Sequence, residues 1–237
     1  MSSTRLPGKV LADINGKPCL ARLVDRLRAC RTLDDIVIAT TDGAADDPIQ
    51  AWCKAYGVAC FRGSEEDVLG RVVGAQRMMR SELIVEVTGD DPLTDPEIID
   101  LGVETFLANA ADVVTNCGAV KTWPIGVYVQ VFPFAALDEV ARTIHDPAVR
   151  EHVSLYFYEH PERYRTINIL APAASRGPDF RFNLDYPEDL AFQNAVYEHL
   201  EPELGGVFGI GPVMELLARE PGLVDINRDC VERKPRG

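Results

Sequence analysis

Apolar positions recur with two different periods along the first half of the chain. Four apolar side chains between residues 18 and 30 fall on one face of a helix, which predicts an amphipathic helix there. The β-branched run at 35–40 ends in Thr-Thr-Asp-Gly and predicts a strand followed by a turn. Ser64 is expected to cap a helix over 64–79, because early acids follow it. The same alternation predicts further helices at 46–57 and 95–110, and strands at 58–62, 83–93 and 112–116.

The pattern becomes less regular after residue 116. It predicts a loop and strand at 122–133, strands at 164–170 and 179–185, and helices at 134–144, 146–160, 186–200 and 212–222. Strands that alternate with helices of 10–15 residues are typical of a parallel sheet with helices on both faces. We therefore predict a single α/β domain over 1–237, with a three-layer, Rossmann-like, mostly parallel (mixed) sheet. Residues of about 122–180 are expected to form a substrate-binding or dimerisation sub-structure on that sheet.

The composition excludes several classes of protein. The 237 residues include 37 Asp and Glu against 24 Lys and Arg, a net charge of −13, and so acidic a chain is a poor partner for nucleic acid. Six cysteines are scattered without CxxC pairs, which predicts reduced thiols and no structural zinc. No apolar run approaches the roughly 20 residues of a transmembrane helix, and no secretory leader pattern occurs. We expect a cytoplasmic protein without a membrane partner.

The charges are distributed unevenly. The first 31 residues contain seven Lys or Arg and two Asp, whereas the rest of the chain carries 17 basic and 35 acidic side chains. A basic segment on an acidic body suits a small polyanion that is bound locally. We interpret Arg22, Arg26 and Arg28 as the solvated face of the first predicted helix. Arg5 and Lys9 remain candidates for anion binding.

The segment SSTRLPGK near the start of the chain has the chemistry of a phosphate-binding loop. The Pro7-Gly8 pair predicts a tight turn that lets backbone N–H groups approach an anion. Arg5 offers a bidentate guanidinium, and Lys9 offers a compact positive charge. The segment lacks the spacing of a P-loop and of a dinucleotide-binding fingerprint. Composition alone favours the alternative of an ordinary exposed basic turn.

Acidic residues follow two of the predicted strands. Asp90 and Asp91 lie in the turn after one apolar strand, and Asp185 ends a later one. Ligands of open parallel sheets bind outside the carboxyl ends of the strands, and Mg²⁺ takes one or two protein carboxylates plus substrate phosphates. Asp90 and Asp185 are therefore candidate ligands of one Mg²⁺. Helix capping explains Asp95 and can explain Asp91, and the helix dipole explains the acids at 188–189.

Seven segments of the sequence occur together in one order. They are STRLPGK, L.DINGKP.L..LVDRL, IVIATTD, GSEEDVLGR, TGDDPL.DP..ID, REHVSLYFY and LDYPEDL. This ordered set resembles the cytidylyltransferase-like family of spore coat polysaccharide biosynthesis proteins, which is similar to acylneuraminate and 3-deoxy-manno-octulosonate cytidylyltransferases. The resemblance extends through most of the chain and implies a fold of the nucleotide-diphospho-sugar transferase type.

The resemblance also implies a reaction and the residues that carry it. It implies an Mg²⁺-dependent nucleotidyltransferase that transfers CMP from CTP to a sugar acceptor and releases pyrophosphate, for cell-surface or spore-coat polysaccharide synthesis. The implied catalytic residues are Arg5, Lys9, Asp90 and Asp185, with Asp90 and Asp185 as the metal ligands. The implied nucleotide-binding residues are Ser3, Arg5, Gly8, Lys9, Ser64, Asp67, Arg71 and Asp90. The implied substrate-binding residues are Pro124, Gly126, Arg150, Glu151 and His152.

Two other functions stay open at this point. A sugar-1-phosphate or molybdenum-cofactor guanylyltransferase has a similar signature loop, although the segments REHVSLYFY and LDYPEDL favour the cytidylyltransferase. A non-catalytic nucleotide-binding subunit is the second. The acceptor could be a nonulosonate, a sugar phosphate or a phosphonate, and Gln130 stands where relatives often carry an acid, which predicts a different acceptor contact. The family resemblance also implies a homodimer formed through residues of about 122–160.

The start of the chain departs from the family pattern. The family has an apolar strand before the signature loop, and Met1 falls at the end of that stretch. Because such a strand is central in a parallel sheet, its loss would expose the backbone hydrogen-bonding groups of its neighbours. We therefore expect the natural protein to begin upstream of Met1.

Overall fold

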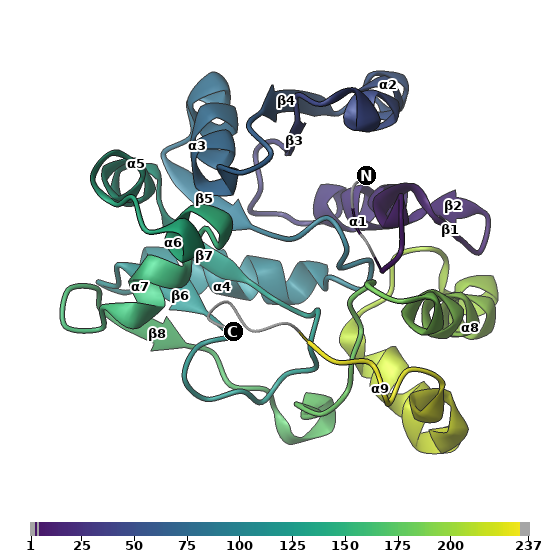
Figure 1. The fold of residues 1–237 in the computed structure, drawn as a ribbon. Helices are drawn as coiled ribbons and strands as arrows, with labels where there is room; N and C mark the ends of the chain where they lie inside the picture. The colour runs from purple at the N-terminus through teal and green to yellow at the C-terminus, as the bar shows by residue number, and fades with distance from the viewer. Residues whose placement is uncertain (1–2, 4, 233–237) are drawn as a thin grey trace.

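The computed structural model of the chain describes residue 3 and residues 5–232 (Figure 1). The helices are α1 (Cys19–Arg28), α2 (Asp47–Tyr56), α3 (Val68–Met79), α4 (Pro96–Ala108), α5 (Phe134–Thr143), α6 (Pro147–Glu151), α7 (Leu155–Glu159), α8 (Pro187–Leu204) and α9 (Ile210–Arg219). The strands are β1 (Asp13–Ile14), β2 (Lys17–Pro18), β3 (Val37–Thr41), β4 (Ala59–Gly63), β5 (Leu83–Glu86), β6 (Val113–Thr115), β7 (Gln130–Pro133) and β8 (Thr166–Asn168). Short 3-10 turns occupy Lys9–Leu11, Ala44–Asp46, Ala173–Ser175 and Pro221–Ile226. Among these described helices, none is long and apolar enough to cross a membrane.

The strands outside the N-terminal hairpin form two separate sheets. β3 pairs parallel with β4, whereas the larger sheet has the order β5-β7-β6-β8. β7 runs antiparallel to both of its neighbours, and β6 and β8 are parallel. The predicted mixed α/β architecture is thus confirmed. β7 comes from the region expected to be a sub-structure, yet it lies inside the main sheet. The expectation of a strand upstream of Met1 is not tested by these residues and stays a prediction.

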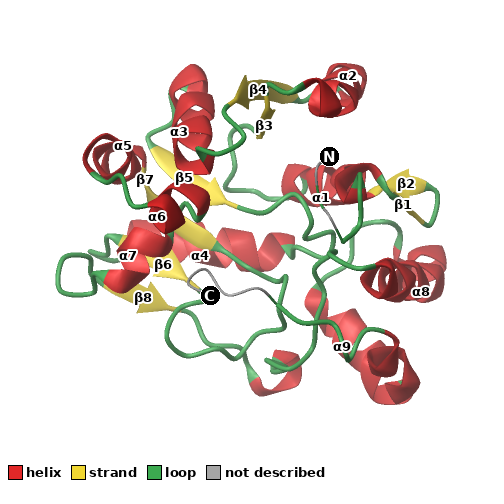
Figure 2. Ribbon diagram, in the orientation of Figure 1, coloured by secondary structure: helices red, strands yellow, loops and turns green. Residues whose placement is uncertain are grey.

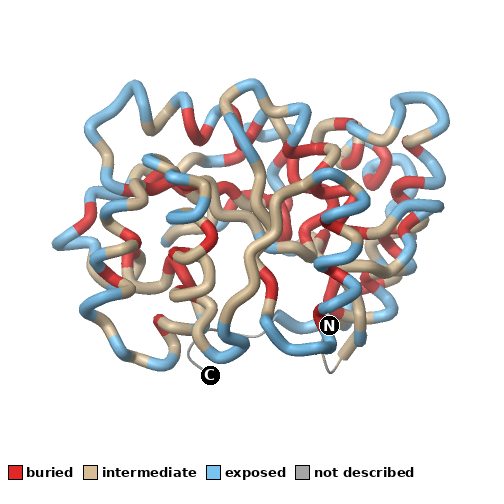
Figure 3. Tube along the Cα trace, turned by 90° about the horizontal axis from the view of Figure 1, so that it is seen from above, coloured by how far each residue is buried: buried red, intermediate tan, exposed pale blue. Residues whose placement is uncertain are grey.

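The four-stranded sheet separates two apolar cores (Figure 2). Val85, Val131 and Val114 are cross-strand partners and belong to the larger core, which α1, α4, α8 and α9 cover. Ile84 and Phe132, one position away, belong to a smaller core with α3, α5, α6 and α7. Because successive side chains of a strand point to opposite faces, both faces of this sheet are covered by helices. Figure 3 shows buried segments running through the middle of the molecule between exposed helix surfaces.

Most predicted elements are present within a few residues of their expected bounds. The hairpin of β1 and β2 was not predicted, although its turn is an Asn-Gly pair with positive φ at Asn15 and Gly16. This pair favours the two-residue turn that joins antiparallel strands. The strands are only two residues each, too short for an alternating apolar pattern to appear.

Two predicted elements were wrong. The helix expected over 146–160 is divided into α6 and α7, because His152 has an extended backbone (φ −115°, ψ 97°). The strand expected over 179–185 has only an isolated bridge between Arg181 and Ile125. The N–H of Asp185 donates to the Asp189 carboxylate at 2.9 Å instead of to a neighbouring strand. Local side-chain acceptors of this kind compete with a sheet ladder.

The interpretation of two arginines as solvated was also wrong. Arg22 and Arg26 are 1% and 0% exposed. The Arg22 guanidinium donates to the Ile14 carbonyl at 2.8 Å and stacks 4.2 Å from the centre of the Tyr197 ring. Arg26 donates to the Tyr197 hydroxyl at 3.0 Å and to the Phe208 carbonyl at 2.6 Å. A buried guanidinium is tolerated when most of its donors are bonded, although Arg26 Nη2 has no partner among the described residues. Tyr197 and Phe208 are distant in sequence, so a helical pattern cannot indicate them.

Candidate functional site

The signature loop is a tight turn that orients two basic side chains. Gly8 has φ 73° and ψ 13°, in the left-handed region that favours glycine, and it precedes the 3-10 turn that begins at Lys9. The N–H of Lys9 donates to the Leu6 carbonyl at 3.2 Å and closes the turn. The Ser3 hydroxyl accepts from the N–H of Leu6 at 3.3 Å. The predicted Pro-Gly turn is thus present, with Arg5 on one side of it and Lys9 on the other.

Two acidic loops meet this turn. Asp90 follows β5, and Asp185 precedes α8. Their backbones are joined directly, because the N–H of Leu184 donates to the Asp90 carbonyl at 2.8 Å. The first loop passes beside the signature segment, since a Cβ at Gly89 would lie at an ordinary contact distance, 3.7 Å, from a methyl group of Val10. Backbone packing therefore fixes the separation of the two carboxylates.

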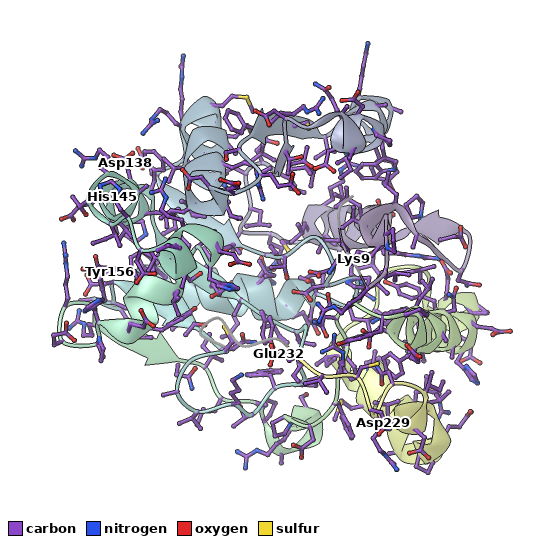
Figure 4. All side chains as sticks on the ribbon, viewed as in Figure 1. Lys9, Asp138, His145, Tyr156, Asp229 and Glu232 are labelled. Carbon is purple, nitrogen blue, oxygen red and sulfur yellow. The ribbon has the colours of Figure 1, made fainter. Side chains whose placement is uncertain are left out.

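The four residues predicted as catalytic contact one another. Lys9 Nζ forms ion pairs with Asp90 and, at 2.7 Å, with Asp185. Arg5 Nη2 lies 2.7 Å from the same Asp185 oxygen. Figure 4 labels Lys9 beside α1, on the side that faces the middle of the molecule. We call Arg5, Lys9, Asp90 and Asp185 the charged cluster.

The charges of this cluster stabilise one another. Burial alone would raise the pKa of Asp185, but Lys9, Arg181 and Arg5 outweigh it and the pKa is lowered. Burial opposes the charge of Lys9 as well, yet the two carboxylates raise its pKa. The neighbouring Asp91 is 1% exposed, and burial together with the charge of Asp90 raises its pKa well above the usual range. Burial is the main cause of that rise, so Asp91 favours its neutral form, and the charges of Asp90 and Asp185 are balanced by Lys9 and Arg5.

Two residues that support the cluster were not predicted. Arg181 Nη2 donates to Asp185 at 2.9 Å, and its Nε donates to Asp189 at 3.0 Å. The ring of Tyr186 lies 4.8 Å from the Arg5 guanidinium carbon, in cation–π geometry. The segment FRFNLDYPEDL held the signal, since Arg181, Asp185 and Asp189 recur every fourth residue. The strand predicted over 179–185 and the helix predicted over 186–200 divide these three residues between two elements, which hides the spacing.

The second predicted nucleotide segment holds together through its own contacts. Asp67, not Ser64, caps α3, accepting from the N–H of Gly70 at 2.8 Å. The Ser64 hydroxyl accepts from the N–H of Asp67 at 3.1 Å, so it closes a turn before the helix. Arg71 Nη1 donates to the Ser64 carbonyl at 2.5 Å, while its buried Nε has no partner among the described residues. A buried donor without a partner is suited to a ligand oxygen.

The predicted substrate segments lie in two places. Gly126 has φ 90°, and a Cβ on it would meet the backbone nitrogen of Asn183 at 2.5 Å, so the buried Pro124–Gly126 turn packs directly against the segment that leads to Asp185. Arg150 instead pairs with Asp67 and links α6 to α3. Glu151 is exposed and His152 is half-buried. Within the described part of the chain, no hydrogen bond or ion pair joins residues 150–152 to the charged cluster, and Arg150 bonds to Asp67 and the Ala141 carbonyl instead.

The charged cluster has the donor chemistry of a divalent-cation site. Asp90 and Asp185 supply hard oxygen ligands, and both reach a single nitrogen atom, Lys9 Nζ. No group of three or more His, Cys, Asp or Glu among the described residues could hold a metal ion. A two-carboxylate site fits Mg²⁺, which completes its shell with water and substrate phosphates. The residues present therefore fit the predicted ion.

Comparison with known proteins decides the family. The family model described as Cytidylyltransferase matches residues 1–207. The chain belongs to the cytidylyltransferase family. It is 35% identical to the spore coat polysaccharide biosynthesis protein SpsF of Bacillus subtilis over 203 residues, covering 84% of this chain and 83% of that protein. It is 29% identical to a 3-deoxy-manno-octulosonate cytidylyltransferase of Anaeromyxobacter dehalogenans over 222 residues, covering 79% and 90% of the two chains.

A solved structure supports the fold of this cytidylyltransferase family member. The chain is similar to a cytidylyltransferase from Leptospira borgpetersenii with a TM-score of 0.88 and 27% identity, covering 99% of this chain and 95% of the other. The similarity confirms the predicted fold of the nucleotide-diphospho-sugar transferase type. The family model and the two sequence relatives confirm the predicted resemblance to spore coat polysaccharide proteins and 3-deoxy-manno-octulosonate cytidylyltransferases.

Proposed function

We propose that the protein transfers CMP from CTP to a sugar acceptor, with release of pyrophosphate, in the synthesis of a cell-surface or spore-coat polysaccharide. The observation that carries the proposal is the convergence of Arg5, Lys9, Asp90 and Asp185 in a member of the cytidylyltransferase family. Two basic side chains beside two carboxylates suit a reaction in which a triphosphate and a cation are bound together.

Each residue of the charged cluster has a role in this reaction. An acceptor oxygen attacks the α-phosphorus of CTP, and the bond from that phosphorus to pyrophosphate breaks. Arg5 and Lys9 donate hydrogen bonds to the phosphate oxygens and stabilise the negative charge on the departing pyrophosphate. Asp90 and Asp185 hold a divalent cation, proposed to be Mg²⁺. When bound, this ion supplies neutralisation of the phosphate charge and orientation of the acceptor oxygen.

The two N-terminal segments hold the nucleotide. The Gly8 turn presents backbone N–H groups to the phosphates, with Ser3 stabilising the loop through the N–H of Leu6. Arg71 offers its buried, unpartnered Nε to the nucleotide. Ser64 and Asp67 orient the segment that carries Arg71. Pro124, Gly126 and Arg150–His152 are proposed to border the acceptor.

The family match favours this function over the alternatives. A guanylyltransferase shares the signature loop but is not the family that matches residues 1–207. A non-catalytic nucleotide-binding subunit has no need for two carboxylates that converge on one lysine. A homodimer through residues of about 122–160 and a cytoplasmic location are further proposals, which size-exclusion chromatography with light scattering and cell fractionation test.

The experiment that tests the function combines nucleotide binding with turnover. Thermal unfolding is measured with Mg²⁺ and each of CTP, GTP, UTP and ATP. A ligand at 100 times its dissociation constant adds about 2.7 kcal/mol of stability, which raises the Tm by several degrees in a chain of this size. We expect a selective shift with CTP that is lost when Mg²⁺ is chelated. A selective GTP shift would support the guanylyltransferase, and CTP binding without pyrophosphate release with any sugar would support the binding subunit.

A further inference from the structure

One residue from each strand of the larger sheet forms a row of polar side chains. Glu86 of β5 is the register partner of Gln130 of β7, Gln130 is the partner of Thr115 of β6, and Thr115 is the partner of Asn168 of β8. Register partners point their side chains to the same face of a sheet. We call Glu86, Gln130, Thr115 and Asn168 the polar row.

The polar row begins where the apolar core of that face ends. Ile84 lies two positions before Glu86 in β5, and Phe132 lies two positions after Gln130 in β7. Both belong to the smaller core under the helices. The row thus lies at the carboxyl ends of β5, β6 and β8, the side of the sheet on which the Asp90 loop leaves β5. Ligands of α/β sheets bind at this edge. Thr115 and Asn168 also bond the loop that follows β6, since they accept from the N–H groups of Cys117 at 3.1 Å and of Gly118 at 3.3 Å. The Glu86 and Gln130 side chains bond instead to the hydroxyl groups of Ser154 and Tyr158, so these two positions need another explanation.

Neighbouring hydroxyl groups extend the polar row into a network. The Ser154 hydroxyl donates to Glu86, and the Tyr158 hydroxyl donates to Gln130. The Tyr158 oxygen also lies 3.2 Å from the Thr115 hydroxyl. Glu86, Gln130 and Tyr158 each keep part of their surface accessible, so the network is not sealed inside the core. It offers acceptor and donor groups to a polar ligand.

The network is adjacent to the charged cluster. Glu86 is the last residue of β5, and Asp90 of the charged cluster follows it by four positions. On the other strands the network reaches Cys117, which lies 3.2 Å from the Thr115 hydroxyl and 3.8 Å from that of Tyr158. The short segment that leaves β5 therefore joins the polar row to the charged cluster.

The polar row has one carboxyl group, that of Glu86, and no basic side chain among its four members. Among the residues that the structure describes, no Lys, Arg or His forms an ion pair with Glu86, whose partner is the neutral Ser154. Burial raises the pKa of Glu86 to about 7, as expected for a carboxyl without a cation. Lys121 pairs with Glu232 at 3.8 Å. A ligand carboxylate or phosphate here would meet a like charge, whereas a hydroxyl, amide or ammonium group would donate to Glu86.

We propose that the polar row is the acceptor-recognition site of the proposed transferase and that Glu86 determines its specificity. It selects acceptors that present hydrogen-bond donors to the row, namely sugar hydroxyl, amide or ammonium groups, and it rejects acceptors that present a carboxylate there. The inference rests on the proposed function, since it assigns the second substrate of that reaction. Glu86 touches the acceptor and takes no part in the chemical step.

The test uses pairs of acceptors that differ by one charge. Pyrophosphate release with CTP and Mg²⁺ is measured for glucose 1-phosphate against glucuronate 1-phosphate, and for the C1 amide of 3-deoxy-manno-octulosonate against the free acid. In whichever pair gives the higher activity, we expect the wild-type chain to prefer the member without the carboxylate at least tenfold in kcat/KM. Glu86→Gln keeps the shape and the Ser154 contact, and we expect it to reduce that preference about tenfold to a hundredfold, the range for a hydrogen bond to a charged group.

A control variant and the pattern of effects on each pair separate specificity from folding. Glu82→Gln changes the exposed glutamate just before β5 and should leave the preference unchanged. If Glu86 had only a structural role, Glu86→Gln would change kcat/KM for both members of a pair by the same factor. That result would overturn the inference. Equal or reversed preference in the wild type also overturns it. If no pair supports turnover, calorimetric binding of the same four compounds with CTP decides, and absence of binding counts against the inference.

The CTP-dependent unfolding shift distinguishes the two levels of failure. A chain that is stabilised by CTP but shows no charge preference contradicts only the assignment of the polar row. A chain that is not stabilised by CTP contradicts the proposed function itself.

Discussion

The charged cluster and the polar row belong to the same end of the sheet but are assembled in different ways. The charged cluster comes from three loops whose contacts span 81 to 180 positions of sequence, and opposite charges hold it together. The polar row is held by strand register and by neutral hydroxyl groups, with Glu86 as its carboxylate. Loops can bring many charges to one point because each charge finds a partner there, which suits phosphates and a cation.

The comparison teaches which part of the site controls which property. Removing a charge from the charged cluster takes away a proposed phosphate or metal contact, so the effect on turnover should be large. Removing the Glu86 carboxyl from the polar row breaks no ion pair, so the effect on activity should be confined to the choice of acceptor. Substitutions in the charged cluster and in the polar row can therefore test this difference.

The largest expected effect is the loss of turnover when the charged cluster is neutralised. Asp90→Asn removes a proposed metal ligand without changing its size, and Lys9→Ala removes a cation that stabilises the leaving group. We expect each to lower kcat/KM for CTP by about a thousandfold, at the upper end of the range for removing one charge-stabilising group. Pyrophosphate release measures the effect. Lys54→Ala and Asp34→Asn, at exposed positions, are matched controls.

Folding must be shown to survive in these two variants. The circular dichroism spectrum and the unfolding midpoint without ligand should remain close to those of the wild type, because the side chains of Lys9 and Asp90 are both partly exposed. Activity near the wild-type level in either variant would show that the charged cluster is not the catalytic centre.

The next effect concerns stability. Arg181 is buried and neutralises Asp185 and Asp189 at 2.9 and 3.0 Å. Arg181→Met keeps much of the volume but leaves Asp189 without its cation and Asp185 with Lys9 and Arg5 alone, and breaking a buried pair in this way costs about 3–5 kcal/mol. We expect the Tm to fall by on the order of 10 °C. Arg142→Met, which breaks a surface pair with Asp138, should change the stability by no more than about 0.5 kcal/mol.

A tolerated Arg181→Met would mean that Asp185 is held by Arg5 and Lys9 alone. Urea denaturation of both arginine variants measures the difference, provided that the m-value is unchanged.

The polar row predicts that the stability of the folded chain depends on pH. The pKa of Glu86 is raised to about 7 from the usual 4.5, so the folded chain binds a proton that the unfolded chain releases between these values. Stability contributed by this group is full below pH 4.5 and falls as the pH rises to 7. Each unit corresponds to about 1.4 kcal/mol. Because Glu86 is partly accessible, we expect about 2 kcal/mol in all.

Glu86→Gln removes this titration. Its stability relative to the wild type should therefore increase from pH 5 to pH 8, by about 2 kcal/mol at most. Glu82→Gln should show no such trend. Parallel stability curves for Glu86→Gln and the wild type over this range would show that Glu86 is already ionised at pH 5.

The two regions also differ in how far the sequence predicts them. Arg5, Lys9, Asp90 and Asp185 were predicted because each lies in a short segment with a family pattern, and the structure brings them together. The polar row was not predicted as a unit. Its members depend on register between strands far apart in sequence, and on an antiparallel β7 that enters the sheet between β5 and β6.

The same reason explains the errors in the elements. A helical pattern shows that one face is apolar, but it cannot show that Tyr197 and Phe208 would enclose Arg26 on the other. The segment 179–185 has strand-like alternation, but the carboxylate of Asp189 takes the N–H of Asp185, and loop carbonyls take those of Phe182 and Leu184. Local pattern thus predicts elements where packing follows the pattern, and fails where a distant polar side chain competes.

The smallest expected effect lies at the edge of the charged cluster. Arg5 stacks on Tyr186 at 4.8 Å from the ring centre, and its Nη1 donates to the Tyr186 hydroxyl across 3.4 Å. Tyr186→Leu removes a partly exposed cation–π contact worth about 0.5–1 kcal/mol, so KM for CTP should rise about two- to fivefold with kcat little changed. Tyr186→Phe keeps the ring and should change KM less than twofold, because a hydrogen bond of 3.4 Å is weak.

The pair of Tyr186 variants determines whether Arg5 is oriented by stacking or by charge alone. If Tyr186→Leu and Tyr186→Phe raise KM equally, the hydroxyl and not the ring orients Arg5. If neither changes KM, Asp185 is sufficient to hold the guanidinium at 2.7 Å. In that case opposite charge alone orders the charged cluster, and its contrast with the polar row, where neutral hydroxyl groups provide the order, becomes sharper.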